Sequence, residues 1–276
     1  MRLVSVAAAV VLASAPGCAL YFEDDGGGGG GTTGDDGGPG GPIDPNPSGS
    51  FTLKKTRAIA GELPVVGVDS DRNGGLWIAY RLQTGDYYSL ADVRVVHVDA
   101  HGTKLAEFKY QDEYTQVSGI AYSGDAVWLS YNAVGTGNNH IRKLDPATGA
   151  RIGSFGTEIG IIDIEAHDDQ LLLSNLWNEV IAIDRATGGE QWRMPVSAFE
   201  DSTQRGIAAT TDGRLWVASS ATNRITLFDA QHQVIGGGTT NLLDAEWNGV
   251  DGLQLGWDGD ELLLATRNQI SWLAPQ

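Results

Sequence analysis

The sequence predicts an all-β fold in which five similar four-stranded sheets, here called blades, stand side by side in a closed ring. The first observation is a unit of apolar strands and short polar turns that recurs along residues 51–276. The second is the lack of any helical pattern between the units. The third is an apolar anchor residue in each unit, repeated 51, 44, 44 and 47 residues apart, at Trp77, Trp128, Leu172, Trp216 and Leu263. A four-stranded unit that repeats about every 45 residues is typical of a β-propeller.

The first two strands of each predicted blade form a hairpin. Apolar strands stand on both sides of a turn rich in Gly, Asn and Asp, which supply the backbone angles that a tight turn needs. The hairpins are "GVDSDRNGGLWIAYR" (67–81), "GIAYSGDAVWLSYN" (119–132), "DIEAHDDQLLLSN" (163–175), "GIAATTDGRLWVASS" (206–220) and "GLQLGWDGDELLLATR" (252–267).

A third strand follows each hairpin, and a fourth follows in all blades but the last. The third strands are "VRVVHVD", "HIRKLD", "VIAID", "RITLFD" and "QISWLAP". Before each fourth strand an Asp begins a short turn, at Asp99, Asp145, Asp184 and Asp229. The last blade lacks a fourth strand, which "FTLKKTRAI" (51–59) is free to supply. This pairing of the two chain ends would close the ring and remove an exposed sheet edge. We therefore expect five blades closed by the strand 51–59, with six blades as the alternative.

The turn "DRNGG" of the first blade has a second interpretation. Asp69, Asp71 and Asn73 have the spacing of the first half of a calcium-binding loop. A complete loop also needs an acid at its twelfth position, which is Tyr80 here. Similar polar turns occupy this place in the other blades, so a hairpin turn is the favoured interpretation and calcium the alternative.

Residues 1–18 have the organisation of a secretory signal peptide. One positive charge precedes an apolar run over residues 3–13, and "ASAPGC" ends at Cys18, the only cysteine of the chain. A small-residue site that ends at a lone cysteine resembles a bacterial lipoprotein signal, in which the cysteine is diacylated and becomes the mature N-terminus. Ala15, where that family usually has Leu, and Pro16 depart from the pattern. Ordinary cleavage to a freely secreted protein is the alternative.

Residues 19–50 are predicted to be a disordered tether. They hold twelve glycines, six acids and no base, including "GGGGGG" and "GDDGGPGGPIDPNPSG". Such a segment cannot bury enough apolar surface to offset the entropy lost on ordering, and it would span about 30 Å as a flexible chain. In the lipoprotein family, Ala19 rather than Asp at this position favours the outer membrane. We therefore expect a lipid-anchored envelope protein, held to the membrane through Cys18.

The repeats of residues 51–276 resemble a broad group of propeller sequences that includes the NHL, YVTN-type and quinoprotein-like repeats. "NRITLFD" and "GRLWVA" are similar to NHL repeats. "IAIDRATGGEQW" (181–192) is similar to a quinoprotein repeat, in which the tryptophan packs against the next blade. The resemblance implies the fold and says little about function.

Composition and motifs exclude several functions. The chain has 35 acidic and 18 basic residues, a formal net charge of −17, which disfavours binding to nucleic acid or to anionic lipid. The folded part has no Gly-x-Ser-x-Gly, no His-Glu-x-x-His and no phosphate-binding glycine loop. We expect no cofactor, no metal and no catalytic residue, and we expect a monomer.

One face of the predicted ring, here the long-loop face, carries the insertions 82–92 and 133–140 and the connections between blades. Loops longer than the repeat requires often serve recognition. The candidate binding residues on this face combine aromatic and acidic side chains: Tyr87, Tyr88, Tyr110, Asp112, Glu113, Tyr114, Phe199 and Trp247. They suit a protein, sugar or small cationic partner, and the alternative is that the aromatic residues pack against the blades.

A second candidate site lies where the innermost strands line the central channel. Four blades begin their first strand with glycine, at Gly67, Gly119, Gly206 and Gly252, and the third blade has Asp163 instead. The candidate polar set is Ser118, Asp163, Arg205 and Asp251. This set is either a functional site or a buried ion pair that fills the channel.

The favoured function is a non-catalytic, envelope-anchored lipoprotein whose propeller binds a ligand or a protein. The alternative is a metal-dependent propeller enzyme, similar to gluconolactonase-like hydrolases or streptogramin lyases. Those families have six or seven blades and hold a metal with channel carboxylates, for which only Asp163 and Asp251 are candidates here. A purely structural envelope protein is a third possibility.

Overall fold

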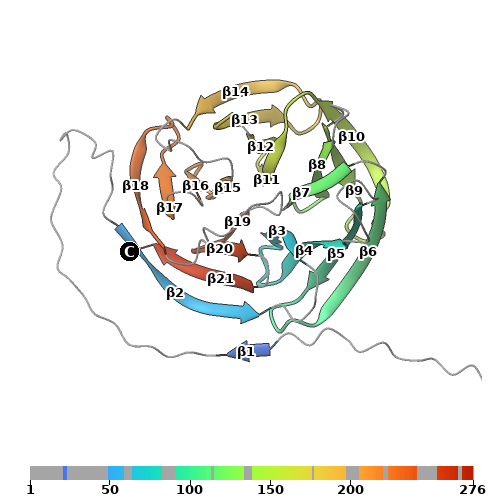
Figure 1. The fold of residues 1–276 in the computed structure, drawn as a ribbon, viewed down its shortest axis with the longest axis horizontal. Helices are drawn as coiled ribbons and strands as arrows, with labels where there is room; N and C mark the ends of the chain where they lie inside the picture. Colours follow the sequence, from blue (N-terminus) through green and yellow to red (C-terminus); the bar gives the residue numbers. More distant parts are fainter. Residues whose placement is uncertain are drawn as a thin grey trace, which may run out of the picture.

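The computed structural model describes most of the predicted propeller and three residues near the N-terminus. The described residues are 21–23, 49–58, 64–82, 91–112, 115–133, 139–175, 177–196, 205–219, 223–240, 254–266 and 269–275. The fold is all-β, with five four-stranded antiparallel blades around a central axis (Figure 1). These ranges contain strands and turns only, so none of them provides a helix of the length and apolar character needed to cross a membrane.

Each of the first four blades is built from four consecutive strands. Blade 1 contains β3 (Val65–Ser70), β4 (Leu76–Leu82), β5 (Ala91–Val98) and β6 (Lys104–Asp112). Blade 2 contains β7 (Thr115–Tyr122), β8 (Val127–Ala133), β9 (Asn139–Leu144) and β10 (Arg151–Thr157). Blade 3 contains β11 (Ile161–His167), β12 (Gln170–Asn175), β13 (Glu179–Asp184) and β14 (Glu190–Pro195). Blade 4 contains β15 (Arg205–Ala209), β16 (Leu215–Ser219), β17 (Arg224–Phe228) and β18 (Val234–Thr239).

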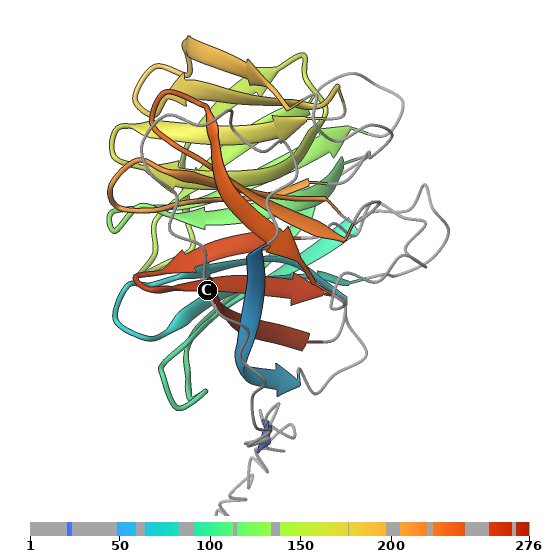
Figure 2. The same cartoon turned by 90° about the vertical axis from the view of Figure 1, so that its left-hand side faces the viewer.

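Blade 5 takes its outermost strand from the other end of the chain. It contains β19 (Gln254–Asp258), β20 (Glu261–Thr266), β21 (Gln269–Pro275) and β2 (Gly49–Ala58), which pairs antiparallel with β21. The first residues of β2 also pair in parallel with β18, so this strand joins blades 4 and 5 on the outside of the ring (Figures 1 and 2). The five blades and their closure by the N-terminal strand are therefore confirmed.

A short strand lies within the segment that the sequence predicts as a tether. β1 (Tyr21–Glu23) pairs antiparallel with β2. The rest of the predicted signal peptide and tether, residues 1–20 and 24–48, lies outside the described residues.

The hydrophobic core is divided among the interfaces between neighbouring blades. Each anchor residue lies in the cluster that its blade forms with the following one, and this holds for Trp77, Trp128, Leu172, Trp216 and Leu263. A single blade would leave these side chains in water, which is why the repeats must stack to bury them.

In each blade, the anchor and the residues that pair with it on successive strands form a row across the sheet. Each row contains one tryptophan, which packs at the interface with the next blade. In blades 1, 2 and 4 the anchor itself is the tryptophan. In blade 3 the anchor is Leu172, and the tryptophan of its row is Trp192 on the outer strand β14. In blade 5 the anchor Leu263 pairs with Trp272 on β21. Trp192 packs against the next blade, where its ring centroid lies 4.3 Å from that of His232, as the quinoprotein resemblance predicts.

The predicted aspartate turns before the fourth strands are present. In each, one carboxylate oxygen accepts the backbone N–H of the residue two positions later, and this holds for Asp99, Asp145, Asp184 and Asp229. The N–H groups of Thr103 and Thr148 hold the pKa of Asp99 and that of Asp145 below their usual values. Part of the acidic composition therefore serves to build turns.

Close contact between the innermost strands explains the glycines at positions 67 and 119. A Cβ atom on Gly67 would lie 2.7 Å from the backbone nitrogen of Ile120. A Cβ atom on Gly119 would lie 2.9 Å from the carboxylate of Asp163. Neighbouring blades can approach this closely only where the strand carries no side chain.

The substitution Gly67→Ala should therefore lower the free energy of unfolding by about 1–3 kcal/mol, because the new methyl group would push two blades apart. Urea denaturation measures this change. Gly156→Ala is the matched control, because a Cβ atom on Gly156 in β10 would meet no atom within 4 Å. Equal losses of stability in the two variants would contradict the close approach at the axis.

Candidate functional site

Three carboxyl side chains are buried near the axis of the ring. Asp69 on β3, Asp163 on β11 and Glu165 on β11 have exposed fractions of 3%, 0% and 3%. Asp163 and Glu165 are two residues apart in one strand, so they share a face. Asp69 and Glu165 each pair with the anchor of their own blade and so lie at the same level. The face of the ring opposite the long-loop face carries the hairpin turns and is here called the short-turn face. Asp69 and Glu165 lie closer to the short-turn face than Asp163 does.

Asp163 links three blades. Its Oδ1 accepts the N–H of Ile164 at 2.8 Å. Its Oδ2 accepts the N–H of Ile207 in blade 4 at 2.8 Å and that of Leu255 in blade 5 at 3.4 Å. Burial raises the pKa of Asp163 well above its usual value, and the three N–H groups oppose that rise. The carboxyl group thus acts as a clamp between backbones that would otherwise leave buried donors unpaired.

Asp69 makes an equivalent link between blades 1 and 2. Its Oδ1 accepts the N–H of Ser70 at 2.7 Å, and its Oδ2 accepts the N–H of Tyr122 at 2.6 Å. Burial raises the pKa of Asp69 to about 7, although the two N–H groups and the charge of Arg72 lower it. Both aspartates therefore bond to the next residue of their own strand and to the innermost strand of the following blade.

Glu165 lies in the same region without such a clamp. Its Oε2 is buried and has no hydrogen-bond partner among the residues that the structure describes. Burial raises the pKa of Glu165 well above its usual value, and the carboxyl groups of Asp69 and Asp163 raise it further. The charge of Arg72 lowers it in part. This environment favours the protonated form of Glu165.

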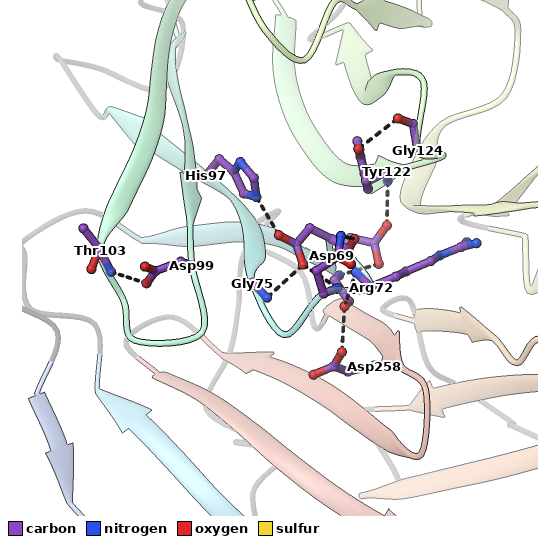
Figure 3. A network of polar contacts seen from close by, with 12 residues as sticks. Asp69, Arg72, Gly75, His97, Asp99, Thr103, Tyr122, Gly124 and Asp258 are labelled. Carbon is purple, nitrogen blue, oxygen red and sulfur yellow. Dashed lines mark hydrogen bonds and ion pairs between the residues drawn. The ribbon is translucent and has the colours of Figure 1, made fainter.

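Arg72 and Ser70 together connect blade 1 to blades 3 and 5 at the short-turn end of the axis, and Figure 3 shows Arg72 and Asp258 there. Arg72 lies in the turn between β3 and β4 with a φ angle of 62°, and its N–H donates to Ser70 Oγ at 2.9 Å. Its Nη2 donates to the carbonyl oxygen of Ala166 in blade 3 at 3.3 Å. Ser70 Oγ in turn donates to Asp258 Oδ1 in blade 5 at 2.7 Å. Polar side chains thus connect the ends of the innermost strands across the ring.

Gln254 fills the axis at the level of Asp163. Its side chain is fully buried, and its Nε2 donates to the carbonyl oxygens of Ser118 and Ile162 at 2.7 and 3.2 Å. The hydroxyl oxygens of Ser118 and Ser130 lie 2.9 Å apart. Blades 2, 3 and 5 therefore meet at this level through buried polar groups.

The predicted channel set is described only in part. Ser118 and Asp163 are both buried near the axis, and they bond to different partners. Arg205 begins β15, but its side chain lies outside the described residues, as does the whole of Asp251. The pairing of these charges with Asp163 stays a prediction.

The candidate binding residues lie mostly outside the described part of the chain. This is true of Tyr87, Tyr88, Glu113, Tyr114, Phe199 and Trp247, and of the side chain of Asp112. Tyr110 is described: it is half-buried against the core between blades 1 and 2, and its hydroxyl donates to the carbonyl oxygen of Gly149 at 2.5 Å. Burial raises the pKa of Tyr110 to about 12. This side chain therefore packs against a blade.

The polar turn between β3 and β4 joins two antiparallel strands, as a hairpin turn does. Asp71 Oδ1 accepts the N–H groups of Asn73 and Gly75, each at 2.8 Å, and its Oδ2 lies 2.8 Å from His97 Nε2 (Figure 3). Asp69 bonds instead to backbone N–H groups at the axis. Among the described residues, no three or more side chains of His, Cys, Asp or Glu lie together in an arrangement that could hold a metal ion.

Sequence reasoning missed several of these residues. Glu165 could have been found from "IIDIEAH" (161–167), where two acids alternate with apolar residues in a buried strand. Arg72 and Gln254 carry no such signal, because their partners belong to other blades. Trp177, in the turn between β12 and β13 on the long-loop face, was also missed, although it is 64% exposed. Its N–H donates to Asn175 Oδ1 at 2.9 Å, which fixes the turn.

Comparisons with known proteins support the fold. No family model and no curated protein matches the sequence. Among solved structures, a glutaminyl cyclase from Myxococcus xanthus has a TM-score of 0.63 and 7% identity, covering 84% of this chain and 98% of its own. A protein of unknown function from Bacteroides caccae has a TM-score of 0.51 and 12% identity, covering 83% and 92%. A virginiamycin B lyase from Staphylococcus aureus has a TM-score of 0.48 and 14% identity, covering 82% and 99%. The first two of these likenesses support the fold and, at these identities, nothing beyond it.

The substitution Glu165→Gln should raise the free energy of unfolding more at about pH 8 than at about pH 5. A carboxyl group whose pKa is raised by folding stabilises the protein fully below its unfolded pKa, and this contribution is lost as the pH rises through the folded pKa. The wild-type protein should therefore lose stability over this interval. The variant cannot ionise at position 165 and should lose less, as measured by urea denaturation at several pH values.

Glu158→Gln, in an exposed turn, is the control and should leave the dependence on pH unchanged. Asp69 and Asp163 still titrate in the Glu165 variant, so the dependence should be reduced without disappearing. If the wild-type protein and the Glu165 variant have the same dependence, Glu165 does not titrate as its burial implies.

Proposed function

We propose that this chain is a lipid-anchored binding protein of the bacterial envelope whose propeller binds a partner through its long-loop face and performs no catalysis. The observation that carries the proposal is Trp177, which is 64% exposed in a turn on that face. Tryptophan is prominent among the residues that dominate binding energy at protein interfaces, and this side chain is open to a partner.

The sequence of the neighbouring loops supports this face as the binding surface. By their place in the sequence, Tyr87, Tyr88 and Trp247 belong to loops and connections of that face and would add aromatic side chains to it. Acidic residues of the same loops favour a partner with basic groups at the rim of the contact. These loop residues lie outside the described ranges, so their part of the proposal rests on the sequence.

The use made of the buried acids supports a non-catalytic role. Both oxygens of Asp69 and both oxygens of Asp163 accept backbone N–H groups. Carboxyl groups bonded in this way hold neighbouring blades together, which gives these two acids a structural role.

The lipid anchor follows from Cys18 and is compatible with the place of β2. This strand is the outermost of blade 5, so the N-terminal segment joins the propeller at its rim (Figure 1).

The alternative is a metal-dependent propeller enzyme, and one observation favours it. Glu165 has a buried oxygen without a described partner, close to two further acids. Raised carboxyl pKa values of this kind also occur in active sites. A divalent ion that copurifies with the wild-type protein and is lost in Asp163→Ala would favour the enzyme.

Trp177→Ala should weaken capture of the partner from envelope extracts about tenfold or more, because truncation of a central aromatic residue commonly costs 2 kcal/mol or more. The thermal stability should change little, since the side chain is exposed. Ile152→Ala is the control: this residue is 54% exposed but lies on β10 at the rim, and its truncation should leave capture unchanged. Equal capture by the wild-type protein and by a variant carrying Trp177→Ala, Tyr87→Ala and Tyr88→Ala would contradict the proposed face.

Palmitate labelling in a bacterial host tests the anchor. The wild-type chain should incorporate label and fractionate with membranes, and Cys18→Ala should lose both properties, because Cys18 is the only thiol of the chain. Ser14→Ala changes a neighbouring residue and should retain the label. Label that persists in Cys18→Ala would show that the anchor is not at this cysteine.

A further inference from the structure

A pocket of about 220 Å³ lies between blades 3 and 4 and opens on the short-turn face. Its apolar part is formed by Leu172, Ala209 and Leu215, and its outer wall by Trp192. Polar side chains of the turns surround the opening. The pocket is smaller than the sites of typical drug-sized ligands, so it would take a small molecule.

Two positions that are aromatic between blades 1 and 2 carry smaller residues between blades 3 and 4. Between blades 1 and 2, the anchor Trp77 packs against Tyr122, with 5.6 Å between the ring centroids. The equivalent residues between blades 3 and 4 are Leu172 and Ala209, as the strand registers show. The tryptophan of this row stands on the outer strand β14 and does not fill the space beside Leu172. Among the five interfaces, this is the one whose row tryptophan stands on the fourth strand of its blade.

The polar residues at the opening have mixed charge. Arg214 and His167 bring N–H donors, and Asp168 and Asp169 bring carboxylates. Arg214 Nε lies 2.9 Å from Asp212 Oδ2, and His167 Nε2 lies 3.5 Å from Asp168 Oδ2. Hydrogen-bond donors and acceptors thus both line the opening, and the Arg214 guanidinium offsets part of the charge of the acids.

We propose that this pocket binds a neutral polyhydroxy compound of the size of a monosaccharide. An anion would meet the carboxylates of Asp168 and Asp169, and a cation would meet the guanidinium of Arg214. Hydroxyl groups both donate and accept hydrogen bonds, so they can satisfy donors and acceptors that stand side by side. The C–H groups of a sugar ring would lie against Leu172 and the wall formed by Trp192. The site is separate from the long-loop face.

Titration of the full chain with glucose, galactose and N-acetylglucosamine, followed by tryptophan fluorescence and calorimetry, tests the proposal. We expect saturable binding of at least one of these sugars. Gluconate, an anion, and glucosamine, a cation, should bind more weakly than the neutral sugars. Leu172→Trp places in the pocket the residue that blades 1 and 2 carry there, and it should weaken binding about tenfold or more. Leu105→Trp, at a 57% exposed position on β6, is its control and should bind as the wild type does.

A second pair of variants keeps the test informative if Leu172→Trp does not fold. Arg214→Gln should also weaken binding about tenfold, a loss of about 1.4 kcal/mol. Arg193→Gln should not, although Arg193 is similarly exposed (48% against 42%) and is likewise paired with a neighbouring acid.

Three results would overturn the proposal: no binding of any neutral sugar, stronger binding of gluconate or glucosamine, or binding that survives both pocket substitutions. Partner capture through Trp177 is measured separately, so either proposal can fail alone.

Discussion

The closure of a ring from only five blades is the constraint on which the rest of the structure depends. It brings the innermost strands so close together that Gly67 and Gly119 have no room for a side chain. The few side chains that remain at the axis must satisfy backbone donors of several blades at once. Asp69 and Asp163 accept such N–H groups with both carboxyl oxygens, whereas Gln254 donates from its amide nitrogen to backbone carbonyl oxygens. The centre of the ring is therefore a polar core surrounded by five apolar ones.

The features that the sequence predicted are those set by local or repeated patterns. Turns that begin with Asp99 or Asp145 depend on bonds within a few residues, so their residue types reveal them. The number of blades followed from the spacing of the anchors, and the closure followed from the missing fourth strand. The interpretation of "DRNGG" as a hairpin turn succeeded for the same reason: it used the equivalence of the blades.

The features that the sequence did not reveal depend on contacts between blades. Glu165 and Arg72 meet at the axis from blades 3 and 1, and no pattern within either strand indicates the partner. The pocket beside Leu172 was hidden for a related reason. In blade 3 the tryptophan of the anchor row is Trp192 on the fourth strand, whereas blades 1, 2 and 4 carry it on the second strand. This difference can be recognised only when the strand register is known. Trp177 stands in a short loop, and the prediction of binding residues considered only the long loops.

The strand that completes blade 5 has a consequence for the order of folding. Phe51 near the start of β2 pairs with Pro275 at the end of β21, so the first part of the domain to be synthesised must wait for the last. Contacts between such distant parts of a chain carry a high entropic cost and form slowly. Until β21 has been synthesised, β2 lacks this partner and the ring stays open, a state compatible with the export that the first residues predict.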